Sequence, residues 1–173
     1  PNDPTGMYSV QAGEIRSRGV ELEAKAALNA NINLTAAYSY TDAEYTEDTI
    51  FKGKRPAEVP RNQASLWTDY TFYDTVLSGL TFGAGVRYTG STVSYYKYDT
   101  STGKKNDSFN VGSYTVADAM VKYDLARFGL PGSSVAVNVN NLFDREYVSS
   151  CYSEYACYWG AERQVVATAT FRF

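Results

Sequence analysis

Residues 80–90, LTFGAGVRYTG, alternate between apolar side chains and small or polar ones. The apolar set is Leu80, Phe82, Ala84, Val86 and Tyr88, and the residues between them are threonine, glycine or arginine. Successive side chains of a strand point to opposite faces of the sheet. The stretch therefore predicts a strand with one apolar and one polar face.

The same alternation recurs along the chain and predicts about seven strands. They are expected at residues 7–28, 31–46, 60–73, 79–93, 114–126, 133–149 and 160–173. Short connections at 28–31, 73–79 and 127–133 alternate with longer, more polar ones. Short turns at one end of a sheet and long loops at the other are typical of outer-membrane barrels.

Aromatic residues support this layout. Tyr70, Phe72, Tyr123, Phe171 and Phe173 fall near the short-turn end, where an aromatic girdle would meet the bilayer interface. Mean hydropathy is −0.36, and no apolar run reaches the roughly 18 residues that a membrane-spanning helix needs. The N-terminus lacks the pattern of a signal peptide, so we expect the chain to be an internal piece of a longer protein.

Periodicity alone leaves two soluble alternatives. A β-sandwich would bury the same alternate residues in its core, and a lipocalin-like barrel would place them inside. Charged residues coat the predicted polar faces, whether these line a lumen or an outer surface: Glu21, Glu23, Lys25, Arg87, Asp118, Lys122 and Asp124.

Two cysteines, Cys151 and Cys157, enclose five residues near the end of a chain that has no histidine, so a zinc site is not expected. They are either free thiols or a disulfide. We favour the disulfide, which implies an oxidising compartment and would close a short loop.

Aromatic residues make this cysteine loop the main candidate for ligand binding. Tyr152, Tyr155, Tyr158 and Trp159 offer flat apolar faces with polar tips, and exposed aromatic patches mark interaction sites. The alternative is that they pack beneath the loop and stabilise it. A second, weaker cluster comprises Tyr95, Tyr96 and Tyr98.

The sequence predicts no enzyme. Without histidine no Ser-His-Asp or Cys-His arrangement can form. Glu21 and Glu23 share a face, as is common on a solvated wall, and we expect neither a metal site nor a cofactor.

Four segments resemble one family, the TonB-dependent receptors. They are QAGEIRSRGVELEAKA (11–26), AEVPRNQASLW (57–67), VNNLFDREY (139–147) and ERQVVATATFRF (162–173). The cysteine loop SCYSEYACYWGAERQ (150–164) is more restrictive and is similar to that of the ferric hydroxamate siderophore receptors, the ferrichrome and ferrioxamine group.

The resemblance implies an all-β, antiparallel transmembrane β-barrel of about 22 strands. Residues 1–173 would supply about seven C-terminal strands of that barrel domain, and the plug domain and the TonB-contacting segment would lie elsewhere. Phe171 and Phe173 resemble the terminal signal for assembly into the outer membrane.

The implied function is uptake of a ferric hydroxamate siderophore across the bacterial outer membrane with energy from TonB. Iron would enter only as part of this ligand. Expected partners are the siderophore, the TonB complex, outer-membrane lipid and lipopolysaccharide, and phages or bacteriocins, but no nucleic acid. The alternatives are a small structural or adhesive barrel and a receptor for another TonB-dependent substrate.

Overall fold

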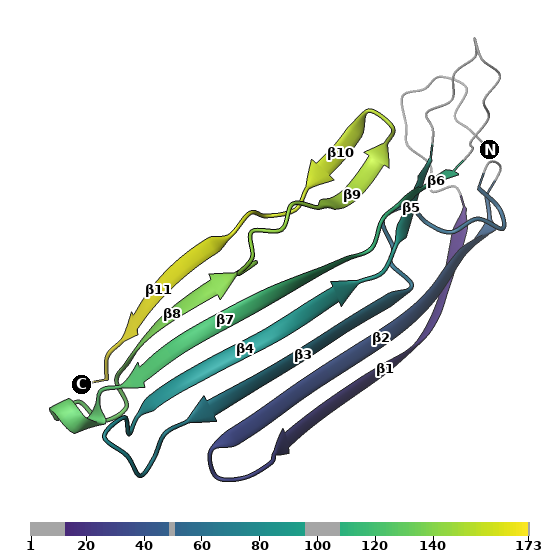
Figure 1. Cartoon of the computed structure of the whole chain (residues 1–173). Coiled ribbons are helices and arrows are strands. Elements are labelled where there is room, and N and C mark those ends of the chain that lie inside the picture. Colours follow the sequence, from purple (N-terminus) through teal and green to yellow (C-terminus); the bar gives the residue numbers. More distant parts are fainter. Residues whose placement is uncertain (1–12, 49–50, 96–107, 173) are drawn as a thin grey trace.

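The computed structural model describes residues 13–48, 51–95 and 108–172. Its main element is a seven-stranded antiparallel sheet in which each strand pairs with the next (Figure 1). In spatial order the strands are β1 (Glu14–Ala27), β2 (Ile32–Glu47), β3 (Asn62–Thr71), β4 (Leu80–Thr89), β7 (Tyr114–Asp124), β8 (Ser134–Asn140) and β11 (Gln164–Thr170).

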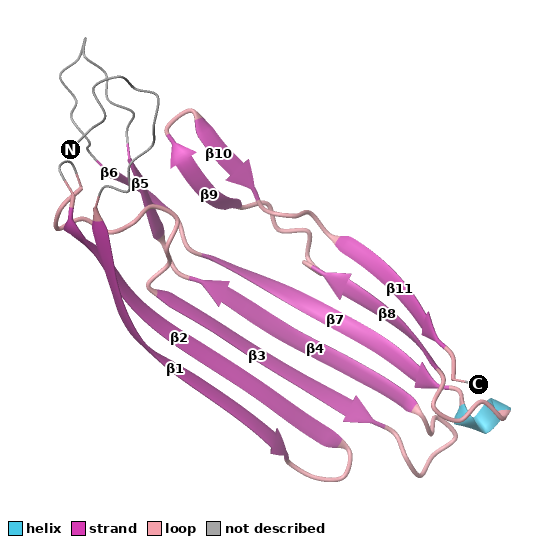
Figure 2. Ribbon diagram, turned by 180° about the vertical axis from the view of Figure 1, so that it is seen from behind, coloured by secondary structure: helices cyan, strands magenta, loops and turns pink. Residues whose placement is uncertain are grey.

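Two hairpins lie apart from this sheet. One consists of β5 (Thr92–Tyr95) and β6 (Ser108–Val111), and the other of β9 (Val148–Ser153) and β10 (Ala156–Trp159). Both lie at the end of the sheet opposite to the short turns and the C-terminus (Figures 1 and 2). A 3-10 helix, η1 (Ala126–Phe128), occupies the turn between β7 and β8.

The seven predicted strands are confirmed as the strands of the sheet, but three of their predicted bounds are wrong by four residues or more. The predicted start of the first strand, at residue 7, lies outside the described residues. The strand expected at 79–93 ends at Thr89, because Gly90 and Ser91 interrupt it before the separate strand β5 begins. The strand expected at 133–149 ends at Asn140, since Asn141 adopts a φ of 53° and begins a turn. The last strand begins at Gln164 rather than at residue 160.

Strand register joins the apolar side chains into one continuous outer face. Tyr38 of β2 pairs with Ala64 of β3, which pairs in turn with Tyr88 of β4. Val121 pairs with Phe82 on one side and with Val137 on the other. Large apolar side chains on this face remain exposed, and no second layer of the described chain covers them. The sandwich and the lipocalin-like barrel both require this face to be buried, so neither describes the fold.

Aromatic residues mark both edges of the apolar face. Tyr38, Tyr40 and Tyr88 lie toward the hairpin end, and the row of Tyr70 and Phe82 lies toward the turn end. Tyr70 pairs with Ile32, eight residues from Tyr40 along β2. Eight residues span about 27 Å of strand, or about 21 Å of height at a tilt of about 40°, which is comparable with the apolar band of an outer-membrane barrel.

The predicted girdle at the turn end is largely present. The Phe72 ring lies 4.8 Å from that of Tyr70 and 6.2 Å from that of Phe82, and Tyr123 contacts Phe128. Phe171 follows β11 and is half exposed, whereas Phe173 lies outside the described residues. Within residues 13–48, 51–95 and 108–172, no helix is long and apolar enough to cross a bilayer.

The opposite face of the sheet is polar and hollowed. A hollow of about 520 Å³ is lined by residues that include Glu21, Glu23, Gln63 and Arg87. On the same face the Trp67 ring lies over Gly83 and Gly85 of β4, where a Cβ would collide with it. The two glycines on the polar side of the alternation in 80–90 thus make room for an indole ring from the neighbouring strand.

An arginine at Val137 should destabilise the barrel, whereas an arginine at Asn138 should not. Val137 lies on the apolar face, where a charge in lipid costs about 2–4 kcal/mol near the bilayer midplane, and Asn138 lies on the polar face. Urea titration of the full-length protein in lipid vesicles, followed by heat-modifiable migration, gives the two free energies of unfolding. If the two arginine variants lost equal free energy of unfolding, the assignment of the apolar and polar faces would be contradicted.

The packing of Trp67 predicts a second result. Gly83→Ala should lower the free energy of unfolding by about 1–3 kcal/mol, because the added Cβ overpacks the space that the indole fills. Trp67→Ala should remove most of that penalty in the double variant. Gly112→Ala, which meets no atom within 4 Å, is the matched control. If the effects of Gly83→Ala and Trp67→Ala on the free energy of unfolding were strictly additive, the contact between Trp67 and Gly83 would be refuted.

Candidate functional site

The hairpin β9–β10 lies at the long-loop end of the seven-stranded sheet, which we call the wall, and a disulfide joins its two strands. Cys151 and Cys157 are direct partners in the register, and their sulfur atoms are bonded. The predicted disulfide is present, so the reading of two free thiols does not hold. Cys151 is 3% exposed, and its strand β9 contacts both β5 and β6. Strand β9, with the buried Cys151, therefore packs against the neighbouring hairpin, whereas Cys157 is exposed.

The four aromatic residues of the hairpin are not used in packing beneath it. Tyr152 is 73% exposed, Tyr155 87%, Tyr158 58% and Trp159 72%. Tyr152 lies on β9, Tyr155 in the turn, and the other two on β10. Their side chains are therefore available to a ligand or partner.

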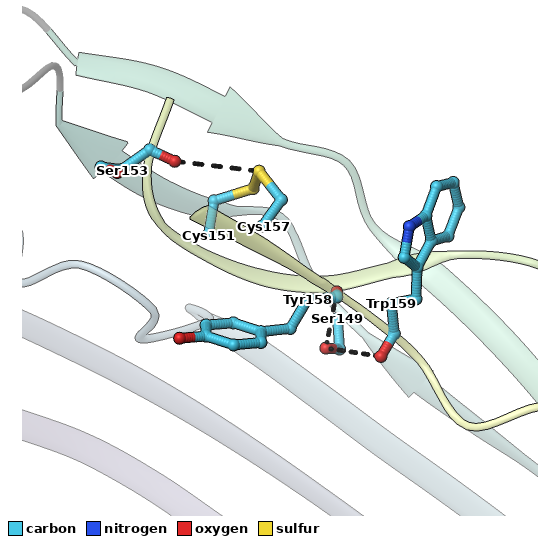
Figure 3. The surroundings of a disulfide bond; sticks show 6 residues. All are labelled: Ser149, Cys151, Ser153, Cys157, Tyr158 and Trp159. Atoms are coloured by element: carbon cyan, nitrogen blue, oxygen red, sulfur yellow. Dashed lines mark hydrogen bonds between the residues drawn. A yellow bond between two sulfur atoms is a disulfide. The ribbon is translucent and has the colours of Figure 1, made fainter. Parts of the chain in front are cut away.

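The structure does not gather these four residues into one cluster. Tyr158 and Trp159 leave opposite sides of β10 (Figure 3). Tyr152 and Tyr158 each directly follow a cysteine, so alternation places both on the face opposite to the disulfide. The hairpin thus presents two aromatic surfaces, which the sequence did not reveal.

Trp159 borders a hollow that sequence reasoning missed. This space of about 310 Å³ is lined by Arg145, Glu146, Tyr147, Trp159, Gly160 and Glu162. Three of the six, Arg145, Glu146 and Tyr147, lie in the segment VNNLFDREY, which the sequence offered as a family motif and not as part of a site. The hollow combines aromatic rings with both signs of charge.

Asn141 links the two stems of the hairpin. Its side chain is almost fully buried, at 3% exposure, and donates to the carbonyl oxygens of Arg145 at 2.9 Å and Ala161 at 3.0 Å. Its Oδ1 accepts from the backbone N–H of Arg145 at 2.9 Å. One amide thereby joins the segment before the hairpin to the segment after it.

Further contacts close the base of the hairpin. Tyr147 stacks on Tyr114 of β7 with ring centroids 4.1 Å apart, and the Gly160 backbone lies so close to the Tyr147 ring that a Cβ would collide with it. The backbone N–H of Arg163 donates to Asp144 at 2.8 Å. We call residues 141–147 together with residues 160–163 the clamp, because they hold both stems.

The clamp is also bonded to the wall. Asp118 on the polar face of β7 accepts from Arg87 Nε at 2.6 Å and Nη2 at 3.0 Å. The same carboxylate accepts from the backbone N–H of Asn141 at 3.0 Å. Nothing in the local sequence signals this contact, since the bonded residues are 31 and 23 positions apart.

The second predicted aromatic cluster is only partly described. Tyr95 packs on Phe51 at 4.8 Å between centroids, and its hydroxyl donates to the Arg55 carbonyl oxygen at 2.6 Å. Burial raises the pKa of Tyr95, and the nearby Tyr45 adds to the effect. Tyr95 therefore anchors residues 51–55 to β5, while Tyr96 and Tyr98 lie outside the described residues. The described parts of the chain contain no group of three acidic, cysteine or histidine side chains that could hold a metal ion.

Sequence comparison places the chain among receptors. The family "TonB dependent receptor-like, beta-barrel" matches residues 1–142. The chain is 64% identical over 172 residues to the "Ferrichrome outer membrane transporter/phage receptor" of Escherichia coli K12, covering 99% of this chain and 22% of that protein. It is 42% identical to the "Ferrioxamine B receptor" of Salmonella typhimurium, with 99% and 23% covered. The chain thus spans less than a quarter of the length of these curated relatives.

Solved structures share the fold. The ferripyoverdine receptor of Pseudomonas aeruginosa has a TM-score of 0.71 at 25% identity, covering 95% of this chain and 20% of that chain. The ferric citrate transporter FecA has a TM-score of 0.73 at 21% identity, covering 93% and 25%, and this likeness concerns the fold alone. Together with the outward apolar face, these matches show that the chain belongs to the TonB-dependent receptor β-barrels of the outer membrane.

Proposed function

We propose that residues 1–173 form the C-terminal part of the barrel of a receptor that binds a ferric hydroxamate siderophore at its outer face and imports it with TonB-derived energy. The observation that carries this proposal is an exposed aromatic hairpin with a fixed base at the loop end of the wall. Similarity to receptors named for ferrichrome and ferrioxamine B supports the hydroxamate class.

The hairpin suits a ligand of this kind. In a ferric hydroxamate the siderophore's own oxygens hold the iron, so the protein needs contacts to the organic shell rather than metal ligands. Tyrosine and tryptophan supply flat apolar area with a polar tip. The disulfide and the clamp fix the hairpin before binding, which lowers the ordering cost of association.

The two aromatic surfaces restrict which residues can share one ligand. Tyr152 and Tyr158 lie on the face opposite to the disulfide, and Trp159 points away from Tyr158 beside the hollow of the clamp. A single small ligand therefore contacts one surface. The other surface is free for a macromolecular partner, and phages or bacteriocins are the proposed class, since one similar structure is a complex with pyocin S2.

Other partners follow from the position of the chain. The apolar outer face requires outer-membrane lipid and, at its outer edge, lipopolysaccharide. The TonB complex would engage segments outside residues 1–173. No catalytic role is proposed, and iron is cargo rather than a cofactor.

Alanine substitutions in the hairpin test the binding role. Loss of the aromatic side chains on the surface that contacts the siderophore should weaken siderophore binding about thirtyfold, since a buried aromatic anchor is worth about 2 kcal/mol. The variants are Trp159→Ala for one surface, and Tyr152→Ala and Tyr158→Ala for the other. Calorimetric titration of the full-length receptor with iron-loaded ferrichrome and ferrioxamine B measures this. Tyr73→Ala, which removes a half-exposed tyrosine at the turn end, is the control. Unchanged affinity in every hairpin variant would reject the hairpin as the site.

Growth tests the transport role and the ligand class together. A strain lacking its hydroxamate receptor, complemented with the full gene, should grow on ferrichrome or ferrioxamine B as sole iron source. Growth should be lost when TonB is deleted. Growth restored only by catecholate or citrate complexes of iron would exclude the hydroxamate assignment.

A further inference from the structure

The carboxylate of Asp118 is the point at which the barrel wall meets the clamp. Arg87, on the neighbouring strand β4, donates to both of its oxygens, at 2.6 Å and 3.0 Å. The Asp118 side chain is 12% exposed, whereas that of Arg87 is 55% exposed on the hollowed face. A two-point bond to a planar guanidinium fixes the orientation of the carboxylate.

That orientation matters because Asp118 has a third donor, the backbone N–H of Asn141 at 3.0 Å. Asn141 has a φ of 53°, which is uncommon for a residue other than glycine. A neighbouring bond from the Leu142 N–H to the Ala117 carbonyl oxygen, at 2.7 Å, holds the turn against β7. Without the carboxylate, the buried N–H of Asn141 would lose its acceptor.

Asn141 passes this restraint to both stems of the hairpin. Its side-chain amide bonds Arg145 before the hairpin and Ala161 after it. The stems lead directly to β9 and to Trp159 at the end of β10. A continuous set of hydrogen bonds therefore runs from Arg87 on the wall to the base of the aromatic hairpin.

We propose that Asp118 is a positioning residue that, oriented by Arg87, sets the direction of the aromatic hairpin through Asn141. Its predicted effect on affinity rests on the proposed function, whereas its effect on the hairpin does not. Asp118 does not itself belong to either aromatic surface. It acts by holding the base of the hairpin in one geometry, so its loss changes where the aromatic side chains point without removing any of them.

Hydrogen exchange of the full-length receptor in detergent micelles tests the mechanical part. In Asp118→Ala the amides of residues 148–159 should exchange about tenfold faster, because a bond to a charged acceptor is lost at the base of the hairpin. Exchange in the barrel strand β11 should stay unchanged. Asp69→Ala is the matched control: Asp69 lies on the same polar face but bonds Asn33 of β2 at 2.9 Å.

The conservative variants keep the test decisive if Asp118→Ala does not assemble. Asp118→Asn retains an acceptor for Asn141 but loses the charge that binds Arg87, and Arg87→Lys removes the two-point bond. Each should accelerate exchange in 148–159, by less than Asp118→Ala. Two results would overturn the proposal. In one, the amides of residues 148–159 exchange no faster in the Asp118 and Arg87 variants than in Asp69→Ala. In the other, exchange accelerates equally in residues 148–159 and in β11.

A double-variant cycle tests the link to binding, with iron-loaded ferrichrome as the titrant. Asp118→Ala should weaken binding about tenfold in the intact hairpin, and less than about twofold once the hairpin aromatic with the largest individual effect is already alanine. If the losses of binding free energy in the two single variants simply added in the double variant, Asp118 would not act through the hairpin. If no aromatic substitution changes affinity while Asp118→Ala still loosens residues 148–159, the positioning role stands and the proposed binding role fails.

Discussion

Hydrogen bonding between neighbouring strands is the constraint on which this structure depends. A bilayer offers no water to unpaired backbone groups, so a membrane-spanning wall must satisfy them within the sheet. The five inner strands pair on both sides and β1 and β11 on one side, in an unbroken antiparallel order, and the register aligns apolar with apolar residues from Val20 on β1 to Val165 on β11. A slip of one residue would move the charged face toward lipid, so pairing and patterning specify each other.

The loop end is held by a different kind of interaction. The β9–β10 hairpin takes no part in the ladder of the wall, so its position depends on the contacts of its two stems. A disulfide joins its strands, the buried amide of Asn141 ties its stems together, and Gly160 leaves room for the Tyr147 ring. This arrangement leaves four aromatic side chains exposed on a fixed base, which is the condition for using them in binding.

Wall and hairpin are connected on the polar face. Arg87 reaches across from β4 to β7, and the carboxylate that it orients also accepts from the turn that follows β8. The same face contains Trp67 lying over two glycines, so the wall combines charged pairs with close packing. A change at the polar face can therefore reach the outer aromatic surfaces without altering the apolar face.

The sequence by itself determined the seven strands, their two faces and the bonding partner of Cys151, because these depend on local alternation and on the only two cysteines present. It did not determine that the strand from residue 79 stops at Thr89, that the cysteine loop is a hairpin, or that Tyr158 and Trp159 point apart. Nor did it reveal the bonds from Arg87 to Asp118 and from Asp118 to Asn141. These features were decided by the tertiary structure, because each depends on backbone turns and contacts between residues far apart in sequence, which a period of two does not encode.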